Sequence, residues 1–337
     1  MKKYIAVILA VFLFLGCSGK SDVPARSTGI ALGTVCSVTV YEGNGDKLLS
    51  GAFSLIERYE KLISRNIPES DVGRLNSQSG ISAVRVSPEV MYLLELSEKY
   101  GKLSGNRFDI TVAPLVDLWG IGTEKGAVPS ADALEKVLSL VDSSRLVLDR
   151  SRGTALLQQE GMGVDLGGIA KGYIADRVRE YLEENKVSGG IIDLGGNIVV
   201  FGSKPDGSDF RIGIQDPFEK RGKYLGIVEL AEGSLVTSGI YERFLEHEGK
   251  HYHHILDPET GFPVENSLAG VAVITGNSAD GDALSTSLFA MGTEKGLALA
   301  ESLPGTEAVF ITRNREIFIT SGLSEKFILT DNNFVLH

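Results

Sequence analysis

The chain has 337 residues, of which 43% are hydrophobic and 23% are charged, a composition typical of a globular protein rather than a disordered or collagen-like one. Its formal net charge of −11 argues against a nucleic-acid scaffold, because such a protein needs a dense face of lysine and arginine. A small anionic ligand stays open, since local donors can outweigh net charge at one site.

The chain begins with a short apolar segment. Two lysines precede an apolar run over residues 4–15, which is too short for an ordinary transmembrane helix. The run ends in "FLGC", which resembles the lipobox at which bacterial lipoproteins are cleaved and acylated on the cysteine. We therefore predict a lipoprotein signal peptide over residues 1–16, a lipid anchor on Cys17, and export to the periplasmic side of the cell membrane. The alternative is a secreted protein with a coincidental cysteine.

Residues 17–27 are polar and turn-rich, and we expect them to form a lipidated tether. Acylation of Cys17 leaves Cys36 without a disulfide partner, so stability must come from a hydrophobic core. No linker rich in proline, glycine or serine interrupts the rest of the chain, which indicates one domain over residues 28–337.

Strands and helices alternate irregularly along this domain. Runs rich in β-branched or aromatic residues predict strands over 35–41, 146–148, 191–201, 210–214, 224–230, 271–275, 308–312 and 316–320. Helical periodicity predicts helices over 53–63, 88–100, 131–141, 169–182, 283–291 and 294–303. The second helix follows Ser87, a capping residue, and starts with Pro88. This order favours an α+β fold with a single main mixed sheet and flanking helices over a doubly wound parallel sheet.

Residues 165–173, "DLGGIAKGY", are the first candidate site. A P-loop needs Gly-Lys followed by serine or threonine, whereas Ala170 precedes Lys171 and Gly172 follows it, so that motif is absent here. Asp165 can still orient a polar group, and Lys171 can neutralise a phosphate. A glycine turn with a surface lysine fits the segment equally well.

A short echo supports the ligand-binding alternative. "VDLGG" at 164–168 returns as "IDLGG" at 192–196, on the far side of the helix predicted between them. A strand, glycine turn, helix and second strand bring both turns to one side of a sheet, where backbone amides can face a ligand.

Asp282 and Thr286 are the second candidate. They are four residues apart at the start of a predicted helix, so their oxygens project from one face, one turn apart. A carboxylate and a hydroxyl placed in this way suit Mg²⁺, which takes few protein ligands and completes its shell with water and phosphate. Alternatively, Asp280 or Ser278 caps the helix and Thr286 is merely packed.

Four of the five histidines lie in "HEGKHYHHILDPETGFPV". A zinc site is disfavoured, because no cysteine is near and His253 and His254 would point to opposite faces of a strand. One buried histidine beside Asp257, available as a general base, is the simpler interpretation, with the other histidines solvated.

Taken in order, these segments resemble the ApbE family, the FAD:protein FMN transferases. The resemblance covers residues 28–325 and rests on nine blocks: "LGTVCSVTVY" (32–41), "LISRNIPESDVGRLN" (62–76), "GNRFDITVAPLVDLWGIG" (105–122), "VDLGGIAKGYIAD", "IIDLGGNIVVFG", "IGIQDP", "VTSGIYERF", "HHILDPETGFPV" and "DALSTSLFAMG". It implies a T-fold-like architecture and a bound FAD whose pyrophosphate is bridged by Mg²⁺.

The resemblance also implies residue roles. The metal ligands are the side chains of Asp282 and Thr286 and the carbonyl of Gly168. The contacts to the flavin nucleotide are Leu32, Asn66, Arg107, Phe108, Asp109, Asp165, Lys171 and Leu256. Asn66 stands where many members carry a tyrosine that lies against the nucleotide.

The implied reaction joins FMN to a protein. A threonine or serine hydroxyl of a partner attacks the phosphorus on the FMN side of FAD and expels AMP, with His254 as base, Asp257 steadying it and Lys171 as a positive contact. The family's acceptors are flavoprotein subunits of membrane redox complexes. Two alternatives stay open, a FAD pyrophosphatase that releases free FMN and AMP, and a flavin-binding lipoprotein without chemistry. A purely structural lipoprotein is a weaker third.

Overall fold

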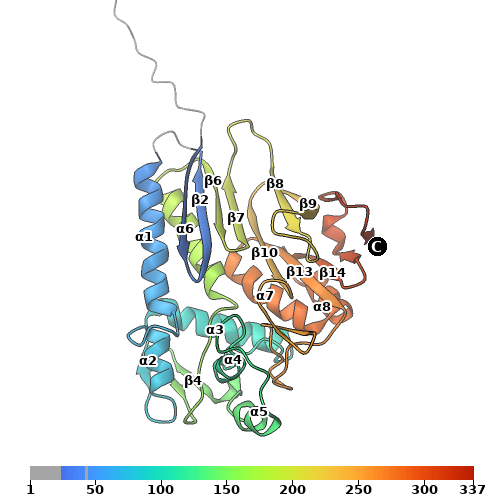
Figure 1. The fold of residues 1–337 in the computed structure, drawn as a ribbon. Coiled ribbons are helices and arrows are strands. Elements are labelled where there is room, and N and C mark those ends of the chain that lie inside the picture. Colours follow the sequence, from blue (N-terminus) through green and yellow to red (C-terminus); the bar gives the residue numbers. More distant parts are fainter. Residues whose placement is uncertain (1–23, 42–44) are drawn as a thin grey trace, which may run out of the picture.

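The computed structural model describes residues 24–41 and 45–337, so the predicted signal peptide and Cys17 lie outside the described residues (Figure 1). The centre of the fold is a nine-stranded sheet with the order β1-β2-β6-β7-β10-β13-β14-β15-β17. In this sheet β17 joins β15 in parallel and the other neighbours pair antiparallel. The predicted α+β fold with one main mixed sheet and flanking helices is confirmed.

The strands of the main sheet are β1 (Ala25–Ala31), β2 (Thr34–Val40), β6 (Gly189–Leu194), β7 (Asn197–Gly202), β10 (Gly233–Gly239), β13 (Leu268–Thr275), β14 (Glu307–Thr312), β15 (Glu316–Ile319) and β17 (Val335–Leu336). Three small sheets accompany it: β8 (Phe210–Gln215), β9 (Tyr224–Leu230) and β16 (Phe327–Leu329); β3 (Val84–Arg85), β5 (Thr154–Leu157) and β4 (Leu146–Asp149); and β11 (Phe244–His247) with β12 (Lys250–His253). The last three residues of the range expected to be a tether, 25–27, belong to β1.

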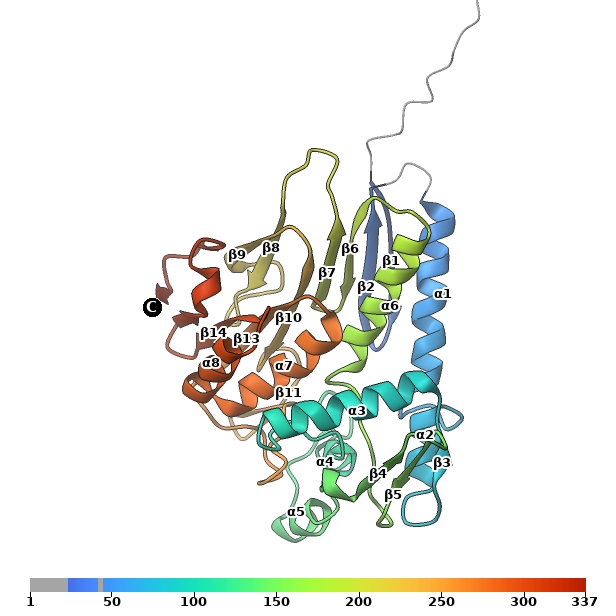
Figure 2. The same ribbon diagram turned by 180° about the vertical axis from the view of Figure 1, so that it is seen from behind.

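The helices are α1 (Asp46–Ile63), α2 (Asp71–Ser77), α3 (Pro88–Leu103), α4 (Ala113–Trp119), α5 (Ala131–Leu138), α6 (Ala170–Glu184), α7 (Ser278–Met291) and α8 (Thr293–Ser302). Helices α6, α7 and α8 cover one face of the main sheet, and α1 stands beside its β1 edge (Figure 2). Helices α2 to α5 form a separate layer at one end of the sheet, together with β3, β4 and β5. Ser87 caps α3 and Pro88 opens it, as predicted.

Hydrophobic packing holds these layers together. The largest core lies between the main sheet and the helices on its α6 side, because alternate strand residues such as Val38 and Val199 meet apolar helix residues such as Val178. A second core on the opposite face lies under β8, β9 and β16. A third, smaller core surrounds Trp119 of α4. In the described part of the chain, no helix is both long and apolar enough to cross a membrane.

Several elements differ from their predictions, and the helix expected over 53–63 begins at Asp46. The strand expected over residues 191–201 is a hairpin, since Gly195 and Gly196 take φ angles of +65° and +96° that reverse the chain between β6 and β7. The helix expected from residue 283 begins at Ser278, because a carboxylate from α6 caps it there. The sequence patterns do not predict the strands β1, β3, β5, β10, β11, β12, β16 and β17 or the short helices α2 and α4.

Candidate active site

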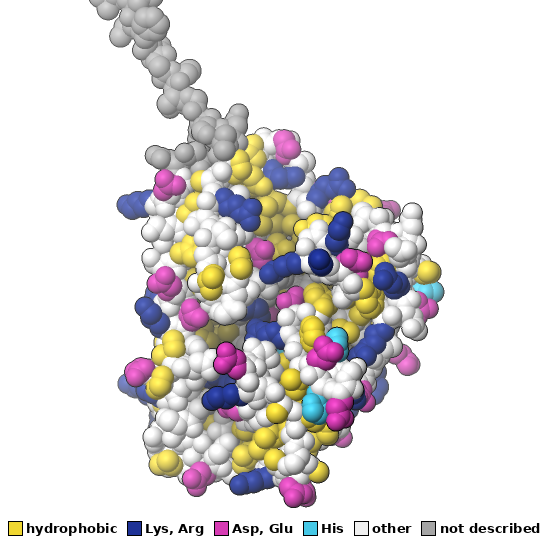
Figure 3. Space-filling view, in the orientation of Figure 1, with side chains coloured by type: hydrophobic (Ala, Val, Ile, Leu, Met, Phe, Trp, Pro, Cys, Tyr) yellow, Lys and Arg dark blue, Asp and Glu magenta, His cyan; other side chains and the backbone are white. Residues whose placement is uncertain are grey.

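A pocket lies at the end of the main sheet that faces α4. It encloses about 270 Å³ and is reached by the β1–β2 turn, the β6–β7 turn, the loop before α6, the second turn of α7 and the segment between β10 and β11. The space-filling view shows this face hollowed near its middle, with basic and histidine side chains beside the hollow (Figure 3). The glycine turns at 167–168 and 195 both reach the pocket, so the expectation from the "DLGG" echo is confirmed.

Most of the residues expected from the sequence meet in this pocket. Those that line it are Arg107, Phe108, Asp109, Asp165, Gly168, Lys171, His254, Leu256, Asp282 and Thr286. Two do not line it. The backbone amide of Leu32 donates to Glu60 Oε1 at 3.0 Å, and it is the next residue, Gly33, that lines the pocket. Asn66 is exposed in the turn after α1.

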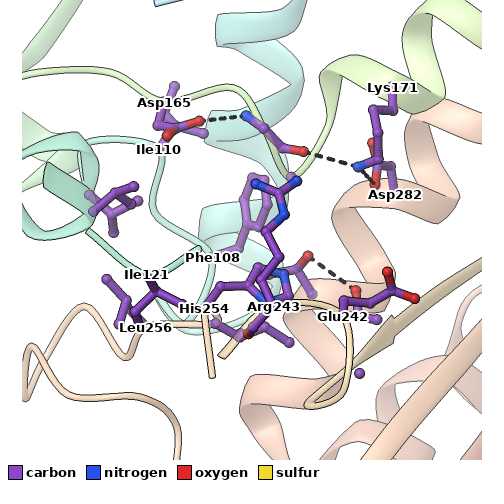
Figure 4. A pocket seen from close by; sticks show the side chains of 18 of the residues that line it. Phe108, Ile110, Ile121, Asp165, Lys171, Glu242, Arg243, His254, Leu256 and Asp282 are labelled. Carbon is purple, nitrogen blue, oxygen red and sulfur yellow. Dashed lines mark hydrogen bonds and ion pairs between the residues drawn. The ribbon is translucent and has the colours of Figure 1, made fainter. Parts of the chain in front are cut away.

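The expected metal ligands gather on the α6 and α7 wall. Asp282 is only 3% exposed, and its Oδ2 accepts a hydrogen bond from the Gly172 amide at 3.0 Å. Its Oδ1 lies 3.5 Å from Lys171 Nζ, and Figure 4 shows these two side chains meeting at one side of the pocket. A Cβ placed on Gly168 would lie 3.5 Å from Thr286 Oγ1, so the backbone of Gly168 and the hydroxyl are neighbours.

Glycine and a buried carboxylate set the distance between α6 and α7. A Cβ on Gly172 would lie 2.1 Å from the carbonyl oxygen of Ser278, so no larger residue fits at this crossing. Asp176 of α6 accepts from the amides of Ser278 at 2.8 Å and Ala279 at 2.9 Å, which caps α7. The alternative that Asp280 or Ser278 caps this helix is therefore wrong. Asp280 instead accepts from the Tyr100 hydroxyl at 2.5 Å.

Asp165 holds the glycine turn in place. Its Oδ1 accepts from the Gly167 amide at 2.7 Å, and its Oδ2 pairs with Arg65 Nε at 2.8 Å. Lys171 Nζ donates to the Gly167 carbonyl at 3.3 Å. Both carboxylate oxygens thus have partners within the protein, and Arg65, the neighbour of Asn66, fixes the wall that carries Gly168.

His254 is placed for proton transfer. Its backbone amide donates to the Arg243 carbonyl at 3.1 Å, and its Nδ1 lies 3.3 Å from the same oxygen. Because a carbonyl oxygen only accepts, Nδ1 carries the ring proton and Nε2 is left as the basic nitrogen. Burial in the pocket and the nearby charge of Arg243 lower the pKa of His254 to about 4, so the imidazole is neutral at pH 7.

The expectation that Asp257 steadies this histidine is wrong. Asp257 Oδ2 pairs with Arg107 Nη1 at 2.7 Å, which ties the loop before α4 to the loop after β12. One histidine of this segment is buried, as predicted, but it is His253, which is 4% exposed and whose Nε2 lies 3.0 Å from the Val264 carbonyl; it is not the general-base candidate. His253 is structural, and His254 is the histidine that lines the pocket.

Asp109 and Phe108 shape the wall opposite α7. The Asp109 carboxylate accepts from the amide and hydroxyl of Thr111 at 2.7 and 2.6 Å and from the Ser143 amide at 3.1 Å. The Phe108 ring is 5% exposed, and a Cβ on Gly168 would lie 3.1 Å from its Cε2. This wall therefore offers the ligand an aromatic side chain and backbone held by Asp109.

Arg243 and Asn197 also line the pocket, although neither is a predicted site residue. The Arg243 guanidinium has no carboxylate partner within the described residues, and it projects into the pocket near Phe108 (Figure 4). Both lie inside segments already noted, "VTSGIYERF" and "IIDLGGNIVVFG". The available signals were a basic residue four positions before the histidine-rich segment and a polar residue directly after two glycines.

Oxygen atoms dominate the potential metal ligands. Over residues 24–41 and 45–337, no three His, Cys, Asp or Glu side chains gather as a metal site would require. A cation in this pocket would therefore bind Asp282 together with hydroxyl and carbonyl oxygens.

Comparison with known proteins places this pocket in context. The model of the ApbE family matches residues 32–310. The chain is 38% identical to a FAD:protein FMN transferase of Klebsiella pneumoniae, over 91% of this chain and 95% of the relative. It is 34% identical to one of Treponema pallidum, over 98% and 97% of the two chains.

Solved structures of ApbE proteins are similar in fold to this chain. The ApbE protein of Thermotoga maritima superposes with a TM-score of 0.83 at 28% identity, covering 89% of this chain and 98% of that one. The flavin transferase ApbE of Vibrio cholerae superposes with a TM-score of 0.80 at 26% identity, covering 90% and 100%.

Proposed function

This chain belongs to the ApbE family, and on that premise we propose that it is a FAD:protein FMN transferase. The acceptor hydroxyl forms a bond to the phosphorus on the FMN side of FAD, the bond from that phosphorus to the bridging oxygen breaks, and AMP leaves. The observation that carries the assignment is the meeting of a neutral His254, Lys171 and the Asp282 wall in one pocket.

His254 is the base in this reaction. The Arg243 carbonyl holds the proton on Nδ1, so the Nε2 lone pair is free to take the proton of an incoming threonine or serine hydroxyl. A pKa near 4 keeps the base unprotonated at neutral pH, although the phosphates of bound FAD will raise it. The proton moves to Nε2 as the oxygen bonds to phosphorus, so no free alkoxide has to form.

Lys171 and Arg243 supply positive charge. Lys171 Nζ forms an ion pair of 3.5 Å with the buried Asp282 and lies 3.3 Å from the Gly167 carbonyl, and these two contacts fix the ammonium at the wall of the pocket. Arg243 lies on the segment between β10 and β11, and its backbone carbonyl accepts the hydrogen bond from His254 Nδ1. Two cations from different elements can hold a diphosphate, whose charge grows on the leaving side as AMP departs.

The same wall fits Mg²⁺. A carboxylate, a hydroxyl and a carbonyl are hard oxygen donors, and Asp282 is buried with the Gly172 amide and the Lys171 ammonium, 3.5 Å away, as its partners. Asp282, Thr286 and the carbonyl of Gly168 would hold the ion. When bound, the ion would spread the negative charge of the pyrophosphate and stabilise the departing phosphate.

We extend the proposal to the place of work and the partner. The lipobox-like segment supports export, acylation of Cys17 and attachment to the cell membrane on the periplasmic side. A tethered enzyme there would meet flavoprotein subunits of membrane redox complexes, which are the acceptors implied by the family.

Replacing Asp282 by asparagine tests the reaction and the metal together. Asp282→Asn keeps an oxygen that can accept from the Gly172 amide but removes the charge that a divalent cation needs. We expect the rate of AMP release from FAD, measured by chromatography, to fall at least a hundredfold. The matched control Asp132→Asn, in the exposed first turn of α5, should leave it unchanged. Unchanged turnover in Asp282→Asn would contradict the assignment of Asp282 as a metal ligand. If the wild-type chain released no AMP, the proposed function would be contradicted.

Mass spectrometry of co-expressed candidate acceptors separates transfer from hydrolysis. An acceptor that gains one FMN in the presence of the wild-type chain, and not of Asp282→Asn, identifies the transferase. Release of AMP with free FMN and no labelled acceptor would instead indicate the pyrophosphatase.

A further inference from the structure

Asn197 is a buried polar residue whose amide is incompletely bonded. It opens β7 directly after Gly195 and Gly196, and it is 2% exposed. Its Nδ2 is buried and has no hydrogen-bond partner in the described structure. The residue nevertheless lines the active-site pocket. A donor without a partner therefore sits at the wall of a cavity that must hold a ligand.

The strand register shows which wall this is. Asn197 lies directly opposite Leu194 on β6 and Val236 on β10, and residues directly opposite in antiparallel strands share a face. Val236 Cγ2 would lie 3.1 Å from a Cβ on Gly281, the residue before Asp282. The Asn197 side chain is thus on the sheet face covered by α6 and α7, at the level of Asp282.

Energetics favour a ligand as the missing partner. A buried N–H without an acceptor costs about 1–3 kcal/mol, and folded proteins keep few of them. The other buried side-chain atoms without partners belong to Arg177, Arg179, Ser234, Ser278 and Thr293. None of those residues lines the pocket. Asn197 alone among them therefore combines an unused donor with a place in the pocket lining.

We propose that Asn197 donates a hydrogen bond from Nδ2 to a non-bridging oxygen of the FAD pyrophosphate, which makes it a substrate-binding residue. This rests on the proposed function for the identity of the ligand. The amide NH₂ group is a donor, and at the level of Asp282 the acceptors that FAD brings are phosphate oxygens. A neutral donor adds a contact to the phosphate without adding a further charge beside the cations of the pocket.

Two variants and one matched control test the proposal. Asn197→Leu removes both polar atoms at nearly constant volume, and Asn197→Asp keeps the shape but replaces the donor by a carboxylate oxygen. Ser234→Ala removes another buried, partnerless group, from β10 outside the pocket. FAD affinity is measured by flavin fluorescence without added metal, so that FAD is not consumed, and ADP is titrated as a displacing ligand. Thermal unfolding of each ligand-free variant is measured in parallel.

Asn197→Leu should bind FAD roughly tenfold or more weakly, the loss expected for one hydrogen bond to a charged group, and ADP should weaken by the same factor. Asn197→Asp should bind both still more weakly, because its carboxylate faces phosphate. The ligand-free Asn197→Leu protein should unfold at the wild-type temperature or above, since it loses an unsatisfied donor and no protein contact. Ser234→Ala should keep wild-type affinity.

Three outcomes overturn the proposal. Unchanged FAD affinity in Asn197→Asp, which is isosteric and should fold, removes the contact altogether. Weaker binding of FAD together with unchanged binding of ADP would place the contact on the flavin rather than on the pyrophosphate. A large loss of stability in ligand-free Asn197→Leu, with Asn197→Asp binding normally, makes the residue structural. If wild-type protein binds FAD but releases no AMP with Mg²⁺, the proposed function fails while this binding comparison still decides the role of Asn197.

Discussion

Replacing Asp176 by alanine should loosen the helix that carries Asp282. Asp176 is 5% exposed and accepts from the amides of Ser278 and Ala279, at 2.8 and 2.9 Å. The capping position itself, Asn277, has no side-chain hydrogen bond to the helix, so α7 depends on a residue of α6 for its N-terminal amides. Arg179 lies 3.9 Å from the same carboxylate and donates to the Gly276 carbonyl at 3.1 Å.

The expected loss follows from these contacts. Each hydrogen bond from a backbone amide to a charged acceptor contributes about 1.5–3 kcal/mol, and the two together give roughly 3–6 kcal/mol. Part of this is offset, because burial raises the pKa of Asp176, which reports the cost of holding the charge away from water. We expect Asp176→Ala to lower the free energy of unfolding by about 2–4 kcal/mol. At roughly 2 °C per kcal/mol for a chain of this size, the midpoint should fall by about 4–8 °C.

Thermal and urea unfolding of the ligand-free protein measure this directly. Asp176→Asn keeps one acceptor oxygen and should lose about half as much. Asp46→Ala, in the exposed first turn of α1, removes the same charge without a buried contact and should change the free energy of unfolding by less than about 0.5 kcal/mol. A loss in Asp176→Ala no larger than that in Asp46→Ala would show that the cap from α6 does not hold α7.

Three further predictions follow from the pocket and the core. Gly168→Ala would place a Cβ 3.1 Å from Phe108 Cε2 and 3.5 Å from Thr286 Oγ1, so a Mg²⁺ titration of AMP release should need several-fold more metal, and an unchanged requirement would place the cation elsewhere. The pKa of His254 is lowered from its ordinary 6.5 to about 4, so its contribution to stability is present above pH 6.5 and is lost as pH falls toward 4. His254→Gln should abolish FMN transfer, and its unfolding midpoint should fall less than that of the wild type between pH 6.5 and pH 4. If the midpoint of this variant fell with pH as steeply as in the wild type, the lowered pKa would not belong to His254. Cys36 is fully buried and burial raises the pKa of its thiol to about 11, so in a Cys17→Ser background a thiol reagent at pH 8 should label Cys36 only during unfolding, as followed by mass spectrometry.

Local sequence patterns predicted much of the fold. Ser87 and Pro88 mark the start of α3 because capping and a fixed proline φ act over a few neighbouring residues. The strand at 191–201 was read as continuous, since its apolar residues carry on through the glycines, and only their positive φ angles divide it. The early start of α7 could not be read locally, because its cap comes from Asp176, about a hundred residues away.

The candidate site divides in the same way. The kinds of group present follow from residue order alone: one helical face with a carboxylate and a hydroxyl, a glycine turn with a lysine, and a run of histidines. Their order also carried the family resemblance. The tertiary structure decided which of them meet and in what state. In the folded chain the His254 ring pairs with the Arg243 carbonyl and Asp257 pairs with Arg107. The Asn197 amide is buried in the pocket wall without a partner. Residue type and spacing fix local geometry, whereas proton positions, burial and unsatisfied donors depend on atoms brought together from distant segments.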